Sequence, residues 1–213
     1  MEKLKKDIRR IPMIFIGFMF LAVGIMLMKR SELGLPPWGV LHQGLEVSTP
    51  LTFGRITQLV GLLVMLISMV FLKTKIGIGT LLNVIFVGWF IDLADYFFAY
   101  TPESLHSQTI LLVLGIILMT FGRSLYISAR LGSGPRDGLF VGLSHVTKID
   151  VKYIKPTIEF IVLFVGFILG GEVGVGTVIA IVLNGYIVQG YMKIMRFDPK
   201  AKQDHNIFAY LKK

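Results

Sequence analysis

The sequence contains no cysteine and few charged residues. The absence of cysteine excludes disulfides, thiolate metal ligands and a cysteine nucleophile. Charged residues make up 16% of the chain, apolar residues make up 54%, and the mean hydropathy is +0.72. A soluble domain of 213 residues could not hide that much apolar surface in its core. We therefore expect an integral membrane protein, with the lipid bilayer as its first partner.

Groups that carry out chemistry are also scarce. The chain has no His and Glu set with zinc-ligand spacing, no serine elbow and no pair of carboxylates spaced for hydrolysis. We therefore expect no catalytic residue, no metal site and no cofactor, and the protein is not expected to be an enzyme. The net charge of +9 sits at the ends of apolar runs, which indicates membrane orientation and not nucleic-acid binding.

Long apolar runs fill most of the chain. Each is about long enough to cross a hydrocarbon core of ~30 Å as a helix, the two shortest with help from their flanks. The six runs are 11–28, 58–72, 76–98, 109–127, 157–170 and 173–192. The basic N-terminus before the first run has no small-residue cleavage site after it, so we interpret this run as a retained span.

Basic residues recur on one side of these six spans. Lys73, Lys148 and Lys193 all return to the side of the basic N-terminus, whereas the segment 94–107 has no Lys or Arg. The positive-inside rule then predicts cytoplasmic N- and C-termini. The exception is the first outer loop, which contains Lys29, Arg30 and Arg55.

The sequence contains an internal duplication. The residues that match are Gly17, Gly24, Gly34 and Pro37 in the first copy and Gly115, Gly122, Gly132 and Pro135 in the second. We divide the single membrane domain, 1–213, into repeat A (11–98), repeat B (109–195) and a short cytoplasmic tail (196–213). Three spans per copy is an odd number, so the copies must be inverted, as in many secondary transporters. The predicted fold is an all-α polytopic bundle of six spans from two inverted repeats.

A short apolar segment follows the first span of each copy, at 35–45 and 133–145. Each begins with glycine and proline, and proline is well tolerated in the first turn of a helix. Each segment therefore predicts a half helix, either re-entrant or interfacial, and Trp38 would anchor the interfacial form. Re-entrant half helices would point their N-termini toward each other, and such termini favour anions. If the segments crossed fully, the repeats would be parallel, which the charge pattern disfavours.

A few polar residues lie within the apolar segments. Arg123 needs a partner or water in the fourth span, and Asp137 and Glu159 are its natural partners. Asp92 and Gln189 occupy matching positions in the two copies, where they either hold helices together or contact a substrate. His42 on the first half helix could contact a solute.

The glycine and proline motifs resemble the bacterial YczE family, within the YczE/YyaS/YitT group of integral membrane proteins. The segments that carry the resemblance are 34–44, 53–55 and 132–139, with Gly39 in the place that matches Asp137. The resemblance covers most of the chain and implies a bacterial cytoplasmic-membrane protein. It implies no biochemical activity.

These observations predict a small inverted-repeat transporter or channel for an unknown small solute or ion. The alternative is a membrane accessory or scaffold protein that acts through a partner protein. A homodimer is compatible with either. The residues expected to line the substrate path are Gly34, Pro36, Pro37, Trp38, His42, Asp92, Arg123, Ser133, Gly134, Pro135, Arg136, Asp137, Glu159 and Gln189.

Overall fold

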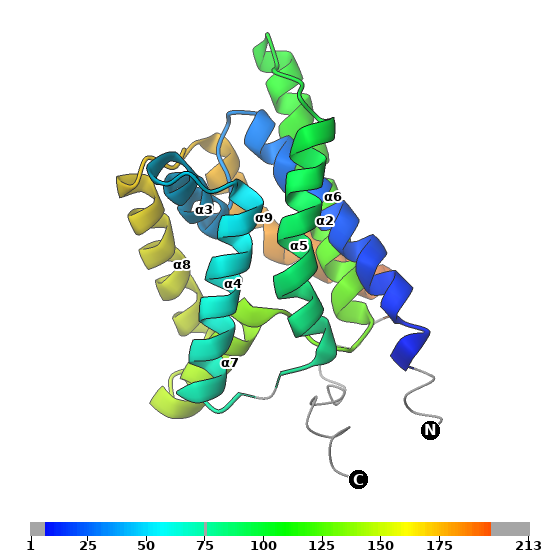
Figure 1. Ribbon diagram of the computed structural model, residues 1–213, viewed down its shortest axis with the longest axis vertical. Helices are drawn as coiled ribbons and strands as arrows, with labels where there is room; N and C mark the ends of the chain where they lie inside the picture. The colour runs from blue at the N-terminus through cyan, green and yellow to red at the C-terminus, as the bar shows by residue number, and fades with distance from the viewer. Residues whose placement is uncertain (1–6, 75, 197–213) are drawn as a thin grey trace.

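The computed structural model describes residues 7–74 and 76–196, so the predicted tail after Arg196 lies outside the described residues. Within these ranges every regular element is a helix (Figure 1). Repeat A contains α2 (Ile11–Arg30), α3 (Pro37–Ser48), α4 (Phe53–Val70) and α5 (Ile78–Phe97). Repeat B contains α6 (Leu105–Ser128), α7 (Pro135–Thr147), α8 (Val151–Ile168) and α9 (Val175–Ile194). Both halves therefore have the same order, with a short second helix, as the duplication predicted.

Five of these helices, α2, α4, α5, α6 and α9, are long and apolar enough to cross a membrane. The protein is therefore an all-helical membrane protein. The fifth predicted span, 157–170, corresponds to α8, which does not meet the same standard because Lys152, Lys155 and Glu159 lie along its 18 residues. Length and composition alone thus give five spans and not six.

The first helices of the two repeats form the centre of the bundle. Glycines let the two backbones approach closely, since a Cβ atom at Gly17 would overlap Gly122 and one at Gly24 would overlap Gly115. These two pairs also show that α2 and α6 run antiparallel. Ile14 and Phe18 of α2 are fully buried beside this seam.

In each repeat, the connection before the short helix contacts the last helix of the other repeat. The carbonyl oxygen of Leu33 accepts a hydrogen bond from the Gly176 N–H at 2.7 Å, and the Leu131 carbonyl accepts one from the Gly79 N–H at 2.7 Å. Both connections continue through a glycine with positive φ, +103° at Gly34 and +137° at Gly132. The two repeats are therefore interlocked by the same contact made twice.

Two of the three basic residues of the predicted first outer loop have acidic partners. Lys29 Nζ lies 2.7 Å from a carboxylate oxygen of Glu46, and Arg30 pairs with Asp95 at 2.5 Å. Pairing reduces the net positive charge of this loop, which was the exception to the charge pattern.

The two repeats differ in how their third and fourth helices pack. In repeat A, α4 lies along α5, and a Cβ atom at Gly54 would overlap the carbonyl oxygen of Gly88. Asp92 of α5 accepts hydrogen bonds from the Gly54 N–H at 2.8 Å and the Thr52 hydroxyl at 2.7 Å. In repeat B, α9 does not pack along α8, and no atom of another described segment lies within 4 Å of a Cβ built at Gly185, the counterpart of Gly88. A closed helix pair in one repeat therefore matches an open pair in the other.

Candidate functional site

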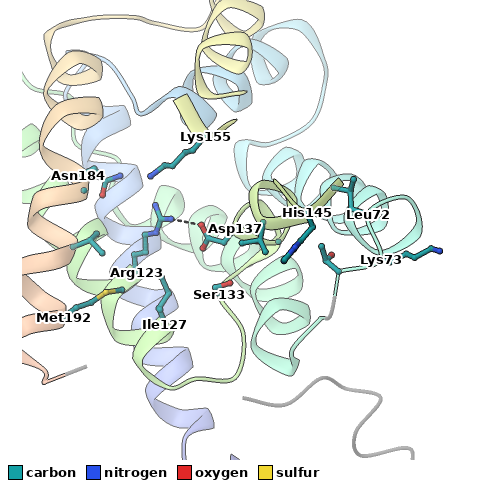
Figure 2. Close-up of a pocket in the computed structure, with 15 residues that line it drawn as sticks. Leu72, Lys73, Arg123, Ile127, Ser133, Asp137, His145, Lys155, Asn184 and Met192 are labelled. Atoms are coloured by element: carbon teal, nitrogen blue, oxygen red, sulfur yellow. Dashed lines mark hydrogen bonds and ion pairs between the residues drawn. The ribbon is translucent and has the colours of Figure 1, made fainter. Parts of the chain in front are cut away.

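The opening in repeat B leads into the middle of the molecule. A cleft of about 760 Å³ begins beside Lys73 and Thr74, at the end of the bundle that carries α7, and reaches Arg123 and Asn184 (Figures 1 and 2). An inner chamber of about 220 Å³ shares Arg123 and Asn184 with the cleft and extends to Trp38. The two hollows thus adjoin at these residues.

Charged side chains from three helices meet where the cleft joins the chamber. Arg123 of α6 points at Asp137 of α7, with 3.1 Å between nitrogen and oxygen (Figure 2). Lys155 and Glu159 of α8 face each other at 3.9 Å, one helical turn apart. The predicted pairing of Arg123 with Asp137 is confirmed. Because the side chains of Arg123 and Asp137 are 29% and 26% exposed, the pair is largely removed from water.

The turn before α7 is held by α6. The Tyr126 hydroxyl donates a hydrogen bond to the Ser133 carbonyl oxygen at 2.9 Å, and Gly134 has a φ of +98° that favours glycine. Pro135 then begins the helix in its first turn. This geometry brings the first turn of α7, with Arg136 and Asp137, to the chamber.

The first turns of α3 and α7 meet at the chamber. The guanidinium carbon of Arg136 lies 4.7 Å from the centre of the Trp38 ring, a distance typical of a cation–π contact. Trp38 and Arg136 occupy matching positions in the two repeats. The contact therefore joins each motif to its own counterpart.

His42 lies one turn further along α3, on the wall of the chamber. The residue is 2% exposed, and its Nδ1 atom lies 3.0 Å from the Thr57 hydroxyl. Among the described residues, its Nε2 atom has no hydrogen-bond partner, and neither does Nε1 of Trp38, which is 7% exposed. Buried polar atoms are normally hydrogen-bonded. The wall of the chamber therefore has two buried nitrogens whose hydrogen-bonding capacity is unused.

Most of the residues predicted for the path line the chamber. They are Pro36, Pro37, Trp38, His42, Arg123, Ser133, Gly134, Pro135, Arg136, Asp137 and Glu159. Gly34, Asp92 and Gln189 line neither hollow. Gly34 packs on the start of α9, Asp92 caps α4, and Gln189 is exposed on α9. Asp92 therefore holds α4 and α5 together, which is one of the two roles predicted for these matching polar positions.

Other lining residues were not predicted for the path. Lys155 was predictable from Glu159, which follows it by one helical turn on the same face. Tyr126 lies one turn after Arg123, but nothing in an apolar span distinguishes a tyrosine that holds a turn from one that packs. Asn184 is a lone amide, and its Oδ1 atom has no hydrogen-bond partner.

The arrangement is suited to binding a polar solute. Among the described residues no group of three or more His, Asp or Glu side chains could hold a metal ion. The chamber instead offers guanidinium, ammonium, indole and imidazole nitrogens, together with the first turns of two helices.

Comparisons with known proteins agree with a membrane protein of this type. The model of a family of unknown function, DUF6198, matches residues 8–193. An uncharacterized protein of Haemophilus influenzae is 36% identical over 88% of this chain and 85% of its own length. In Bacillus subtilis, the uncharacterized membrane protein YczE is 33% identical over 82% of this chain and 81% of its own, and the uncharacterized protein YyaS is 26% identical over 84% and 90%.

No solved structure matches the chain. The family model covers nearly all of the described residues, and the similarity to YczE extends over most of both chains. The chain therefore belongs to the family of unknown function DUF6198 and is a member of the YczE family of membrane proteins.

Proposed function

We propose that this protein is a small transporter of the bacterial cytoplasmic membrane, built from two inverted repeats, that passes a small polar solute through the central chamber. The observation that carries the proposal is the difference between the repeats, with α4 closed on α5 and α8 open from α9. Two copies of one unit in two conformations form a path that is closed at one end and open at the other. Exchange of the two conformations would reverse the open end.

The glycine seam supports inversion of the repeats. The contact of Gly17 with Gly122 becomes the contact of Gly115 with Gly24 when the repeats are exchanged. A two-fold axis that relates two antiparallel helices in this way runs perpendicular to them. For helices that cross a bilayer, that axis lies in the membrane plane, which is the geometry of inverted repeats.

The contact of Trp38 with Arg136 supports a substrate site on this axis. Matching residues can contact each other only near the axis that relates them, and these two residues line the chamber. Transporters with inverted repeats hold their substrates at the repeat interface.

The placement of the short helices supports the re-entrant form over the interfacial one. α3 and α7 lie at opposite ends of the bundle (Figure 1), yet their first turns meet at the chamber. Non-helical backbone at membrane depth is tolerated where protein buries it, and the connection at Leu33 and Gly34 is covered by the start of α9. We assign the α7 end, with Lys73 and Lys148, to the cytoplasm.

Single-cysteine labelling tests the inversion, because the chain has no background cysteine. Buried positions such as Ser31 and Gly171 are out of reach of a thiol reagent. Val47 and Thr147, near the C-terminal ends of α3 and α7, are exposed and suit labelling. We expect a membrane-impermeant thiol reagent to label Val47→Cys on intact cells and Thr147→Cys only after the cells are opened. Labelling of both from the same side would contradict inverted repeats and the transporter proposal with them.

A further inference from the structure

The carboxylates of the chamber already have partners. Asp137 pairs with Arg123 at 3.1 Å, and Glu159 lies 3.9 Å from Lys155. Arg136 makes no hydrogen bond or ion pair with any described residue, and its contact is the face of Trp38. The chamber therefore holds one cation more than its anions can pair.

The wall of the chamber also contains a buried hydrogen-bond donor that has no acceptor among the described residues. Arginine and tryptophan side chains only donate hydrogen bonds. The Nε1–H of Trp38 has no acceptor among the described residues, although only 7% of the residue is exposed. A buried donor without an acceptor is costly, so a missing acceptor is expected from a ligand. The same wall also holds two unpaired acceptors, Nε2 of His42 and Oδ1 of Asn184. His42 Nε2 is an acceptor because the Thr57 hydroxyl donates to the Phe53 carbonyl oxygen and therefore accepts from His42 Nδ1–H.

The first turns of α3 and α7 add further donors. α4, α6 and α8 each have a side-chain cap, from Thr52, Ser104 and Asp150. The cap positions of α3 and α7 are Pro36 and Gly134, and neither provides a side-chain hydrogen bond. The starts of α2, α5 and α9 also have no side-chain cap, but the first turns of α3 and α7 are the ones that line the chamber. The free N–H groups and the dipole at such a helix start attract anions.

We infer that the chamber binds a small oxyanion, which Arg136, the indole N–H of Trp38 and the first turns of α3 and α7 hold. This inference rests on the proposed function and names the class of its substrate. Stacking on Trp38 fixes the guanidinium plane and leaves its edge free to bind two oxygens at once. A volume of about 220 Å³ is below the ~300–1,000 Å³ of drug-sized pockets, so the solute is small.

Binding can be measured on the full chain in detergent, independently of transport. The probes are sodium phosphate, sulfate and acetate, titrated at constant sodium concentration with chloride as the balancing ion, and thermal stabilisation is the readout. We expect at least one probe to stabilise the protein saturably. The expected effect of Arg136→Gln is a loss of ~10-fold or more in affinity, with a smaller loss in Arg136→Lys, which keeps the charge without the planar fork.

Trp38→Phe provides a second test if Arg136→Gln does not fold. It keeps an aromatic face beside Arg136 and removes the indole N–H. This variant is also expected to weaken binding, whereas the exposed control Arg55→Gln should bind as the original protein does. No saturable binding of any probe, or binding that is unchanged in the Arg136 and Trp38 variants, would overturn the oxyanion site.

A lipid headgroup carries the same oxyanion chemistry, so short-chain phosphatidylglycerol is added as a separate arm. Stabilisation by phosphate without lipid supports a free solute, and stabilisation by the lipid alone overturns it. Liposome flux separates the two proposals. Oxyanion binding without flux of the bound probe would contradict transport and leave the oxyanion site standing. Flux of cations or neutral solutes without oxyanion binding would contradict the oxyanion site and leave transport standing.

Discussion

At the scale of single residues, charge pairing decides what the chamber can hold. Arg123 and Lys155 each have a carboxylate partner, whereas Arg136 rests on an aromatic ring. A charge in an apolar surrounding is tolerated when it is paired or reaches water. The pairing of Arg123 and Asp137 therefore stabilises the fold, and the unpaired Arg136 remains available to a ligand.

The stability of this pair can be tested by substitution. Arg123→Gln or Asp137→Asn alone leaves one charge without its partner in a site that is less than a third exposed, which we expect to cost ~1–3 kcal/mol of unfolding free energy. The double variant should lose less than the sum of the two single losses, measured by thermal unfolding in detergent. Lys152→Gln, at a side chain that is 64% exposed, is the control and should change little. Additive losses would contradict a direct interaction.

At the scale of elements, the connections before the short helices interlock the repeats. Leu33 and Leu131 each accept a hydrogen bond from the first turn of the other repeat's last helix. The chain reaches these helices through Gly34 and Gly132, whose positive φ angles suit glycine. The start of each short helix is thereby fixed relative to the other repeat.

A methyl group at Gly34 should loosen this contact. The Cβ of Gly34→Ala would lie 2.6 Å from both the Gly174 nitrogen and the Thr177 hydroxyl oxygen, at a φ of +103°. We expect a loss of ~1–3 kcal/mol from backbone strain alone, measured by thermal unfolding. Gly190→Ala is the matched control, since nothing lies within 4 Å of its Cβ, and it should be neutral or gain up to ~1 kcal/mol of helix propensity. Equal effects of the two substitutions would argue against a strained connection at Gly34.

At the scale of the whole molecule, the two repeats differ in conformation while sharing a sequence pattern. The helix pair α4 and α5 is closed at Gly54 and Gly88, and the matching positions of repeat B, Lys152 and Gly185, lie on helices that do not pack together. In the proposed transporter, inverted repeats in unlike conformations would give a path with one open end. Transport then requires that repeat B can close as repeat A has closed.

A disulfide can detect that closure. In the double variant Lys152→Cys and Gly185→Cys, closing α8 on α9 would bring the two thiols together. Because a Cβ atom at Gly54 or Gly88 would overlap the facing carbonyl oxygen, the cysteine pair closes to a wider separation than the glycine pair, which is the separation that a disulfide needs. We expect the disulfide to form under mild oxidation, as seen by mass spectrometry of the full chain in membranes. The pair Lys152→Cys and Val178→Cys, which moves the second thiol toward the opposite end of α9, is the control and should stay reduced. A Lys152 and Gly185 pair that never oxidises would contradict the exchange of conformations.

The sequence by itself determined the class of protein, the helices and the duplication. Apolar run length and glycine spacing act locally, because a helix in lipid needs only its own residues to satisfy its backbone. The pairing of Arg123 with Asp137 was also predictable, since a short chain segment joins their helices and an arginine in an apolar span needs a partner. Asp92 and Gln189 occupy matching positions but have different surroundings, because matching positions in two repeats meet only near their axis.

Only the tertiary structure decided which matching positions lie at that axis and which helix pair is closed. The contact of Trp38 with Arg136 depends on how α3 and α7 enter the bundle, and no local pattern records that angle. Asp92 became a cap for α4 because α4 packs along α5, whereas Gln189 was left exposed because α9 does not pack along α8. The two repeats share a sequence pattern but make different helix contacts, and contacts between distant segments are set by packing.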